Sequence, residues 1–411
     1  MKENWKIETQ AVQGSYAPKP TEPRIPAICQ STTFKYSSAD HVAKLFDLDI
    51  ADHMYSRISN PTSEALEGKI AMLEGGIGAL ATSSGQAAIS GSILNICQTG
   101  QHIVTASTLY GGTYSLFANT LVRYGIKTKF VDTTDVAAYQ DAITDHTKLI
   151  FIETIGNPKI DVPNIKAIAE IAKNNGIVFV VDNTVATPVM LKPKSLGADI
   201  VIHSTSKYIN GHGNSIGGIV VDCGTFNWSN PRYEHLEPFY KKVRQFAFMA
   251  LLRNRVYRDL GFCMSPFNAF LMSIGIESLA VRMERHCSNA ATIAAALDND
   301  NRIQNVRYPG LETHSDHATA KEQFNGLYGA IMTIELDDKK SCFNFMNNLK
   351  RVQILANIGD AKTLAIHPAS TFCRDASESE RTGMGVTDNL IRLSIGLEHV
   401  DDIIADIDQS L

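Results

Sequence analysis

The sequence predicts an α/β protein with a mostly parallel, doubly wound sheet, a smaller C-terminal α/β domain and an extended N-terminal arm. Two observations indicate this fold class. Short β-branched runs alternate with helical segments, and the runs lack the strict apolar–polar alternation of a sheet with one solvated face. The first 60 residues, by contrast, have no regular pattern. A length of 411 residues is also more typical of two domains than of one.

Residues 1–60 form the predicted arm. Four prolines disfavour a helix in its middle, because proline lacks an N–H donor and fixes φ: Pro18, Pro20, Pro23 and Pro26. Regular structure begins at Asn60-Pro61, where a capping residue and a proline mark a helix start. We therefore expect an extended arm that needs something else to pack on.

A parallel α/β domain is predicted over residues 61–260, because its strands and helices alternate as in a βαβ series. The expected strands are Ala79–Thr82, Ile103–Ala106, Lys129–Asp132, Leu149–Glu153, Ile177–Asp182, Ile200–His203 and Gly218–Val221. A C-terminal domain is predicted over residues 261–411. Its expected helices are Pro266–Ile274, Glu277–Leu297 and one from about Val400, and its expected strands are Ile303–Val306, Ala330–Leu336 and Leu390–Ile395.

Composition excludes several classes of protein. The net charge is −5 and no long basic run occurs, so we expect no nucleic-acid partner. The apolar runs have strand length, and no signal-like segment follows Met1, so we expect a cytoplasmic protein without a membrane partner. Seven cysteines without a Cys-x-x-Cys motif argue against a disulfide framework or a structural zinc site, and we expect no metal.

Polar residues with chemical potential follow three predicted strands, where ligands bind in open α/β sheets. Ser84-Gly85-Gln86 joins a strand to a helix, and free N–H groups there suit an anion. Asp182 ends a wholly apolar strand and needs a cationic or hydrogen-bonding partner. Lys207 follows another strand and precedes a glycine-rich stretch, where a desolvated amine can attack an aldehyde. A phosphate cradle, a ring-nitrogen partner and an amine are what pyridoxal phosphate (PLP) needs.

The chain resembles the cystathionine-γ-synthase-like family of fold-type I PLP enzymes, which act in cysteine and methionine metabolism. The matching motifs occur in the family order over nearly the whole chain: residues 55–62, 83–85, 110–113, 153–158, 182–184, 204–207, 367–370 and 392–394. The resemblance implies a transferase fold of this type with PLP as its cofactor.

The resemblance also implies roles for individual residues. Lys207 matches the Schiff-base lysine, Asp182 the partner of the pyridine nitrogen, and Tyr110 the catalytic aromatic residue stacked on the ring. The remaining cofactor-binding residues that it implies are Ser84, Gly85, Gln86, Thr184, Ser204, Ser206, Tyr55 and Arg57. The substrate-binding residues are Arg392, for the carboxylate, with Asn357, Tyr55 and Asn157.

Tyr55 and Arg57 match a pair that reaches the phosphate in the neighbouring subunit. The implied assembly is a homotetramer made of two such dimers. This match explains why residues 1–60 lack a core of their own, and it implies that a monomer is inactive.

Three features favour the sulfhydrylase branch, which converts O-acetyl-L-homoserine and sulfide or a thiol into L-homocysteine or methionine and acetate, a step of methionine biosynthesis. These are Gly112, where methionine γ-lyases usually have cysteine, Asn357, where many lyases and synthases have serine, and a longer segment from Gly224 to about Asp259. One departure follows Ser370: the chain reads Thr371-Phe372-Cys373-Arg374 where relatives commonly have Thr-His-Ser. Its effect on specificity stays open.

The nearest alternative is a methionine γ-lyase or a cystathionine lyase or synthase of the same family, which would use the same residues. A nicotinamide-dependent oxidoreductase is disfavoured, because Gly76-x-Gly78 precedes its strand and lacks the third glycine of the dinucleotide fingerprint. A non-catalytic binding protein would not need Lys207, Asp182 and Arg392 together. The sequence alone leaves open the acyl group and the sulfur donor.

Overall fold

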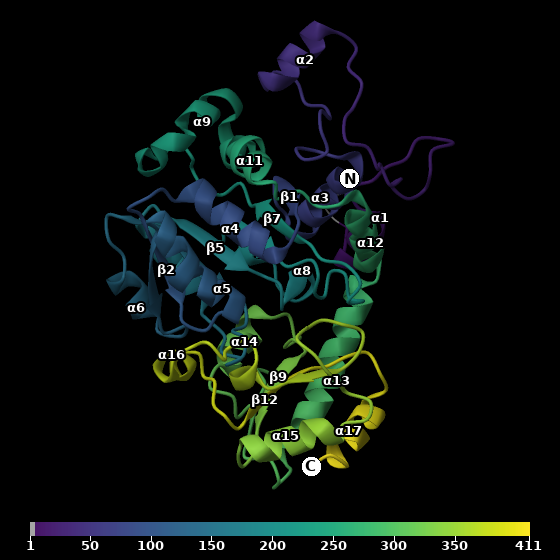
Figure 1. The fold of residues 1–411 in the computed structure, drawn as a ribbon, viewed down its shortest axis with the longest axis vertical. Helices are drawn as coiled ribbons and strands as arrows, with labels where there is room; N and C mark the ends of the chain where they lie inside the picture. Colours follow the sequence, from purple (N-terminus) through teal and green to yellow (C-terminus); the bar gives the residue numbers. More distant parts are fainter. Residues whose placement is uncertain (1–4) are drawn as a thin grey trace.

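The computed structural model describes residues 5–411. Two sheets lie one above the other along the long axis of the molecule, and the long helix α13 (Leu279–Asp298) runs down the lower part beside the second sheet (Figure 1). The first sheet is mostly parallel and the second mostly antiparallel. This arrangement confirms the predicted fold class.

The first sheet has seven strands in the order β1-β7-β6-β5-β4-β2-β3. Their bounds are β1 Gly78–Thr82, β2 His102–Ala106, β3 Lys127–Val131, β4 Thr147–Glu153, β5 Val178–Asp182, β6 Ile200–His203 and β7 Gly218–Asp222. β7 is antiparallel to both of its neighbours, β1 and β6, and the other strand pairs of this sheet are parallel. All residues of β4, β5, β6 and β7 are buried, which explains why their sequences are continuous apolar runs.

The second sheet has five strands in the order β10-β11-β12-β9-β8. Their bounds are β8 Asn305–Arg307, β9 Ile331–Glu335, β10 Gln353–Ile354, β11 Leu364–Ile366 and β12 Leu390–Ser394. The short β10 and β11 were not predicted, because two or three residues are too few for a periodicity signal.

Helices cover both sheets (Figure 1). The α-helices other than α13 are α1 Ile7–Gln13, α2 Ala39–Phe46, α3 Pro61–Glu74, α4 Gly85–Ile96, α5 Gly111–Ser115, α6 Val136–Asp141, α7 Ile165–Asn174, α8 Thr187–Met190, α9 Glu237–Val243, α10 Ala247–Leu251, α11 Arg258–Leu260, α12 Pro266–Glu277, α14 His317–Gln323, α15 Lys339–Asn348, α16 Glu378–Gly383 and α17 Val400–Asp408. As predicted, Asn60 caps α3, accepting a hydrogen bond from Thr62 N at 3.0 Å. No helix in residues 5–411 combines the length and apolar composition needed to cross a membrane.

The N-terminal segment leaves the body of the molecule and carries α2 at its far end (Figure 1). Two short helices, which we did not predict, interrupt the otherwise extended chain. α1 packs against α3, α12 and α13, so the beginning of the arm is held by its own chain. The segment after it has only a small cluster of its own, made of Leu45, Met54 and Ile58.

Candidate active site

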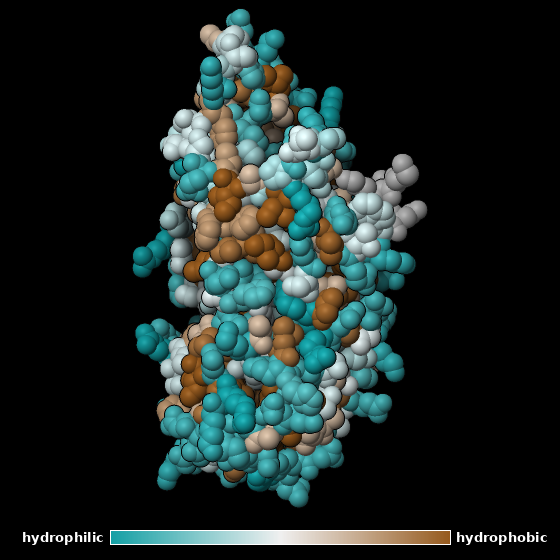
Figure 2. Space-filling view, turned by 90° about the vertical axis from the view of Figure 1, so that its right-hand side faces the viewer, coloured by the Kyte–Doolittle hydropathy of each residue, from teal (hydrophilic) through white to brown (hydrophobic). Residues whose placement is uncertain are grey.

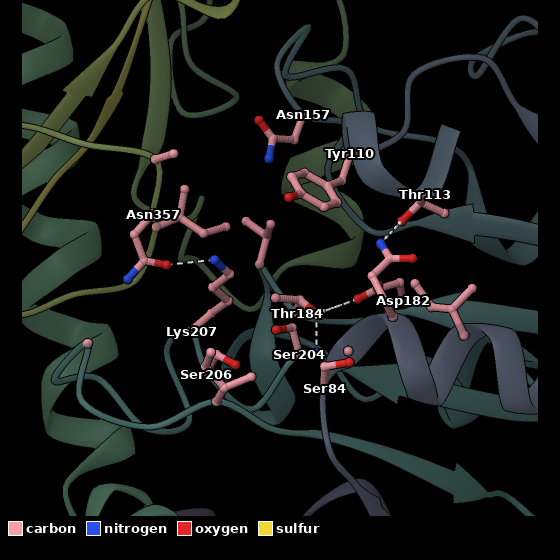
Figure 3. A pocket seen from close by; sticks show the side chains of 18 of the residues that line it. Ser84, Tyr110, Thr113, Asn157, Asp182, Thr184, Ser204, Ser206, Lys207 and Asn357 are labelled. Atoms are coloured by element: carbon pink, nitrogen blue, oxygen red, sulfur yellow. Dashed lines mark hydrogen bonds between the residues drawn. The ribbon is translucent and has the colours of Figure 1, made fainter. Parts of the chain in front are cut away.

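A cavity of about 710 Å³ lies where the carboxyl ends of β4, β5 and β6 face loops of the C-terminal part (Figure 3). It brings together twelve predicted site residues: Ser84, Gly85, Gln86, Tyr110, Asn157, Asp182, Thr184, Ser204, Ser206, Lys207, Asn357 and Arg392. Tyr55 and Arg57 do not line it. Asp182 and Lys207 meet in this cavity because the carboxyl ends of the parallel strands β5 and β6 lie at one edge of the sheet.

Lys207 projects into this cavity from the turn after β6. Its Nζ donates a hydrogen bond to Asn357 Oδ1 at 2.6 Å (Figure 3). Burial, followed by the nearby positive charge of Arg392, lowers the pKa of Lys207 to about 8. An amine with this pKa is partly neutral at physiological pH and is able to act as a nucleophile or a base.

Asp182 ends β5 and faces the same cavity. Thr184 donates to its Oδ1 through the backbone N at 2.9 Å and through Oγ1 at 2.5 Å. Burial raises the pKa of Asp182, and the two bonds from Thr184 oppose that rise. No hydrogen bond from residues 5–411 reaches its Oδ2. A buried carboxylate in this position lacks a cationic partner, which a protonated ring nitrogen would provide.

An anion cradle surrounds the N-terminus of α4. Ser84 Oγ caps the helix, accepting from Ala87 N at 3.1 Å, and Gly85 and Gln86 begin the helix with N–H groups that have no intrahelical acceptor. A Cβ atom at Gly85 would lie 2.7 Å from Ser204 Cβ, so only glycine fits there. Ser206, by contrast, uses its hydroxyl on Gly217, donating to its O at 3.1 Å and accepting from its N at 3.0 Å.

Glu153 is a site residue to which the sequence analysis gave no role. It lines the cavity at the end of β4 and is paired with Asp182 in the register of β4 and β5. Its Oε1 accepts a hydrogen bond from Tyr110 N at 2.8 Å, which fixes the backbone that carries the aromatic ring. Burial, and then the charge of Asp182, raises the pKa of Glu153 well above its usual value. The signal that singled out Asp182, an acid ending an apolar strand, also applied to Glu153.

Arg392 reaches the cavity from β12 and is 4% exposed. Its Nη1 donates to Asn157 Oδ1 at 3.2 Å and its Nη2 to Asn357 O at 2.9 Å, whereas its Nε–H has no acceptor in residues 5–411. Burial lowers the pKa of this guanidinium to about 10. No carboxylate of the described chain forms a salt bridge with it, so the site holds a buried cation that lacks an anion.

Tyr55 and Arg57 lie on the projecting arm. The guanidinium carbon of Arg57 is 5.4 Å from the centroid of the Tyr55 ring, and its Nη1 donates to Arg258 O. Tyr55 is 38% exposed. Within their own chain these two residues therefore have no part in the cavity.

The residues present fit pyridoxal phosphate. An amine with a lowered pKa, a carboxylate lacking a cation and a helix N-terminus with a glycine-only approach match its aldehyde, ring nitrogen and phosphate. A Cβ atom at Gly218 would lie 2.2 Å from Ser84 O, so the backbone also packs tightly beneath the cradle. Fold and cavity together define a PLP-dependent enzyme of fold type I.

The family is identified by sequence as well. A model of the Cys/Met metabolism PLP-dependent enzymes matches residues 8–411, and the chain belongs to this family. The O-acetyl-L-homoserine sulfhydrylase of Leptospira meyeri is 42% identical over 100% of this chain and 98% of its own. The L-methionine gamma-lyase of Fusobacterium nucleatum is 40% identical over 93% of this chain and 92% of its own.

A solved structure from the family resembles this fold closely. The O-acetylhomoserine (thiol)-lyase of Campylobacter jejuni has a TM-score of 0.95 and 35% identity over 99% of both chains, and that structure contains a pyridoxyl-lysine phosphate. PLP is thus the cofactor of this family, as the sequence motifs had indicated.

Proposed function

We propose that the chain catalyses γ-replacement, converting O-acetyl-L-homoserine and sulfide or a thiol into L-homocysteine or methionine and acetate. The observation that carries this proposal is the buried Arg392, a cation without an anion, placed beside the Lys207 amine through the shared neighbour Asn357. An α-amino acid offers the missing carboxylate together with an amine. Relatives named sulfhydrylases support the choice of reaction.

In this mechanism Arg392 binds the α-carboxylate of the substrate as a two-pronged donor. When bound, PLP supplies an electron sink for the pair released at the α-carbon. Asp182 keeps the ring nitrogen protonated, and Thr184 holds Asp182 ionised with two hydrogen bonds. Ser84, Gly85, Gln86 and Ser204 would hold the phosphate, with Ser206 beside them bonded to Gly217.

Lys207 moves the protons of the reaction. Its neutral amine takes the α-proton and then transfers protons at the β-carbon, so that acetate leaves from the γ-carbon. Sulfide adds at the γ-carbon and the same proton transfers run backwards. Tyr110, fixed through its backbone by Glu153, covers the reacting face and assists these transfers, and Asn157 and Asn357 keep Arg392 and Lys207 in place.

An elimination enzyme is the second candidate, because a methionine γ-lyase is also 40% identical. Gly112 argues against it. A Cβ atom at position 112 would lie 2.6 Å from Tyr110 Cε1, so a cysteine there would force the Tyr110 ring to move. A lyase with cysteine at this position would therefore need the Tyr110 ring to be placed differently from its placement in this chain.

One assay separates the two functions. The purified enzyme is given O-acetylhomoserine with sulfide, and in parallel methionine alone. We expect homocysteine from the first mixture at a rate at least about tenfold above that of 2-oxobutyrate from the second. Faster 2-oxobutyrate release from methionine would assign the chain to the lyases. O-Succinylhomoserine and a thiol donor complete the substrate comparison.

A homotetramer made of two dimers is part of the proposal. Exposed apolar residues occur along α12 and next to it: Phe267, Ile274, Val281 and Ile216. Figure 2 shows the side of the molecule with α1 and α12, where apolar residues gather in the upper half. Such a patch is typical of a subunit interface. In the dimer, Tyr55 and Arg57 of one subunit reach the phosphate in the other.

The division of the chain is also proposed from the sheets. An arm of residues 1–60 precedes a cofactor-binding domain of 61–260, which holds the first sheet, and a C-terminal domain of 261–411, which holds the second. A cytoplasmic location is supported by seven cysteines that are all free thiols, as in a reducing compartment.

A further inference from the structure

Phe372 lies in the cavity wall at a position that the proposed reaction leaves unused. Its ring centroid is 6.3 Å from that of Tyr110, and the guanidinium carbon of Arg392 is 5.3 Å from its centroid. Phe372 thus contacts both the residue that covers the reacting face and the residue that binds the carboxylate. We expect a substrate held by Arg392 and covered by Tyr110 to extend its side chain past the Phe372 ring.

The loop that carries Phe372 is firmly held. Cys373 is buried, and its N donates to Pro368 O at 3.1 Å. Thr371 Oγ1 donates to His367 O at 2.8 Å. On the other side, a Cβ atom at Gly111 would lie 2.8 Å from Phe372 O, so the loop packs directly on the start of α5. The backbone that carries the aromatic ring is therefore held in place at the cavity wall.

The charges of the cavity define what this wall accepts. Of the residues lining the cavity, Lys207 and Arg392 are the cationic ones, and Glu153 and Asp182 are the acids. The proposed function commits Lys207 to the cofactor, Arg392 to the α-carboxylate and the neighbour's Arg57 to the phosphate. A second carboxylate on the substrate, as in a succinyl ester, would then lie against an aromatic face without a cation, which is costly.

We propose that Phe372 is the residue that restricts the γ-substituent to a small uncharged acyl group, acetyl, and rejects succinyl. This inference rests on the proposed function and deepens it by naming the determinant of its leaving group. Rejection follows from two properties of the ring: it offers no hydrogen bond to a carboxylate, and it fills the space beside Arg392 where a second cation would stand.

The test is the ratio of kcat/KM for O-acetylhomoserine to that for O-succinylhomoserine. We expect a ratio of at least about 50 in the native enzyme and at least a tenfold lower ratio in Phe372→Lys, because the new cation pairs with the succinyl carboxylate. Phe372→Leu, which keeps an apolar wall, should retain the native ratio within about threefold whatever its rate. Val122→Lys adds the same charge at a position that is 53% exposed and outside the cavity, and should leave the ratio unchanged.

A binding measurement separates selectivity from turnover. Each ester is titrated calorimetrically into Lys207→Ala and into the double variant Lys207→Ala/Phe372→Lys. The ratio of the two dissociation constants should change in the same direction as the kcat/KM ratio. An unchanged ratio in both experiments overturns the role of Phe372. If the native enzyme forms homocysteine from neither O-acetylhomoserine nor O-succinylhomoserine, the proposed function is refuted instead. Should Phe372→Lys fail to load the cofactor, Phe372→Gln must also lower the ratio, and if it does not the inference fails.

Discussion

At the scale of single residues, burial explains the chemistry of the site. Lys207 and Arg392 are cations in a cavity whose burial lowers the pKa of both, and the charge of Arg392 lowers the pKa of Lys207 further. Asp182 and Glu153 are carboxylates whose pKa rises for the same reason, burial. Within the described chain Arg392 lacks an anionic partner and Asp182 lacks a cationic one. The site is therefore suited to bind an amino acid and a cationic ring.

The pH dependence of cofactor capture should report the amine of Lys207. Its pKa of about 8 means that the neutral, reactive form accumulates as pH rises through that value. In stopped-flow absorbance, the rate at which apoenzyme captures added PLP should increase about tenfold per unit below pH 7 and level off above about pH 9. Lys207→Ala should show no covalent capture and no turnover. A rate that still rises beyond pH 10 would indicate an ordinary, solvated lysine.

Replacing the carboxylate-binding residue tests its geometry separately from its charge. Arg392→Lys keeps the cation but loses the planar fork and the bonds to Asn157 and Asn357. We expect kcat/KM for O-acetylhomoserine to fall about 100-fold, equivalent to about 2.7 kcal/mol, mainly through KM. Arg302→Lys, on a surface ion pair with Asp300, is the matched control. Equal effects of the two changes would contradict a specific role for Arg392.

At the scale of elements, each strand places one functional group at its carboxyl end. β4 ends at Glu153, β5 at Asp182, and β6 leads into the turn with Lys207. The first turn of α4 adds the anion cradle. These placements follow from local sequence, because a buried parallel strand must be apolar until the point where it leaves the sheet. Hence the strands of the first sheet were predicted to within about two residues of their bounds, and Asp182 and Lys207 were found as site residues, whereas Glu153 was missed.

The first turn of α4 offers a direct test of the cradle. Gly85→Ala places a methyl group 2.7 Å from Ser204 Cβ and must displace the helix start or the serine. We expect the dissociation constant for PLP, measured by fluorescence titration of apoenzyme, to rise at least about tenfold. Gly383→Ala in α16, where a Cβ atom has no neighbour within 4 Å, is the control and should bind normally. Unchanged affinity in Gly85→Ala would place the phosphate elsewhere.

At the scale of the whole molecule, Tyr55 and Arg57 lie outside the cavity of their own chain. A site that needs both must borrow them from another subunit. The exposed apolar residues near α12 offer a surface for such an assembly.

Mixed oligomers test this sharing. Arg57→Ala lacks the phosphate contact and Lys207→Ala lacks the amine, so each variant alone should have little or no activity. Refolded together, they should regain up to about a quarter of native activity, because some sites combine an intact Arg57 with an intact Lys207. The measurement is homocysteine formation by oligomers whose mixed composition is verified by mass spectrometry. Continued inactivity of verified mixtures would mean that each subunit has a complete site.

The sequence by itself determined the sheet, the cofactor class and the residues at the strand ends, because these depend on local periodicity and on motifs within a few residues of each other. Tertiary structure decided which distant residues lie near Lys207. Asn357, its hydrogen-bond partner, is 150 residues away in the chain, and Arg392 and Phe372 line the same cavity from the C-terminal part. It also decided, through strand register, that Glu153 lies beside Asp182. Contacts of this kind arise from packing between distant segments, which no local pattern encodes.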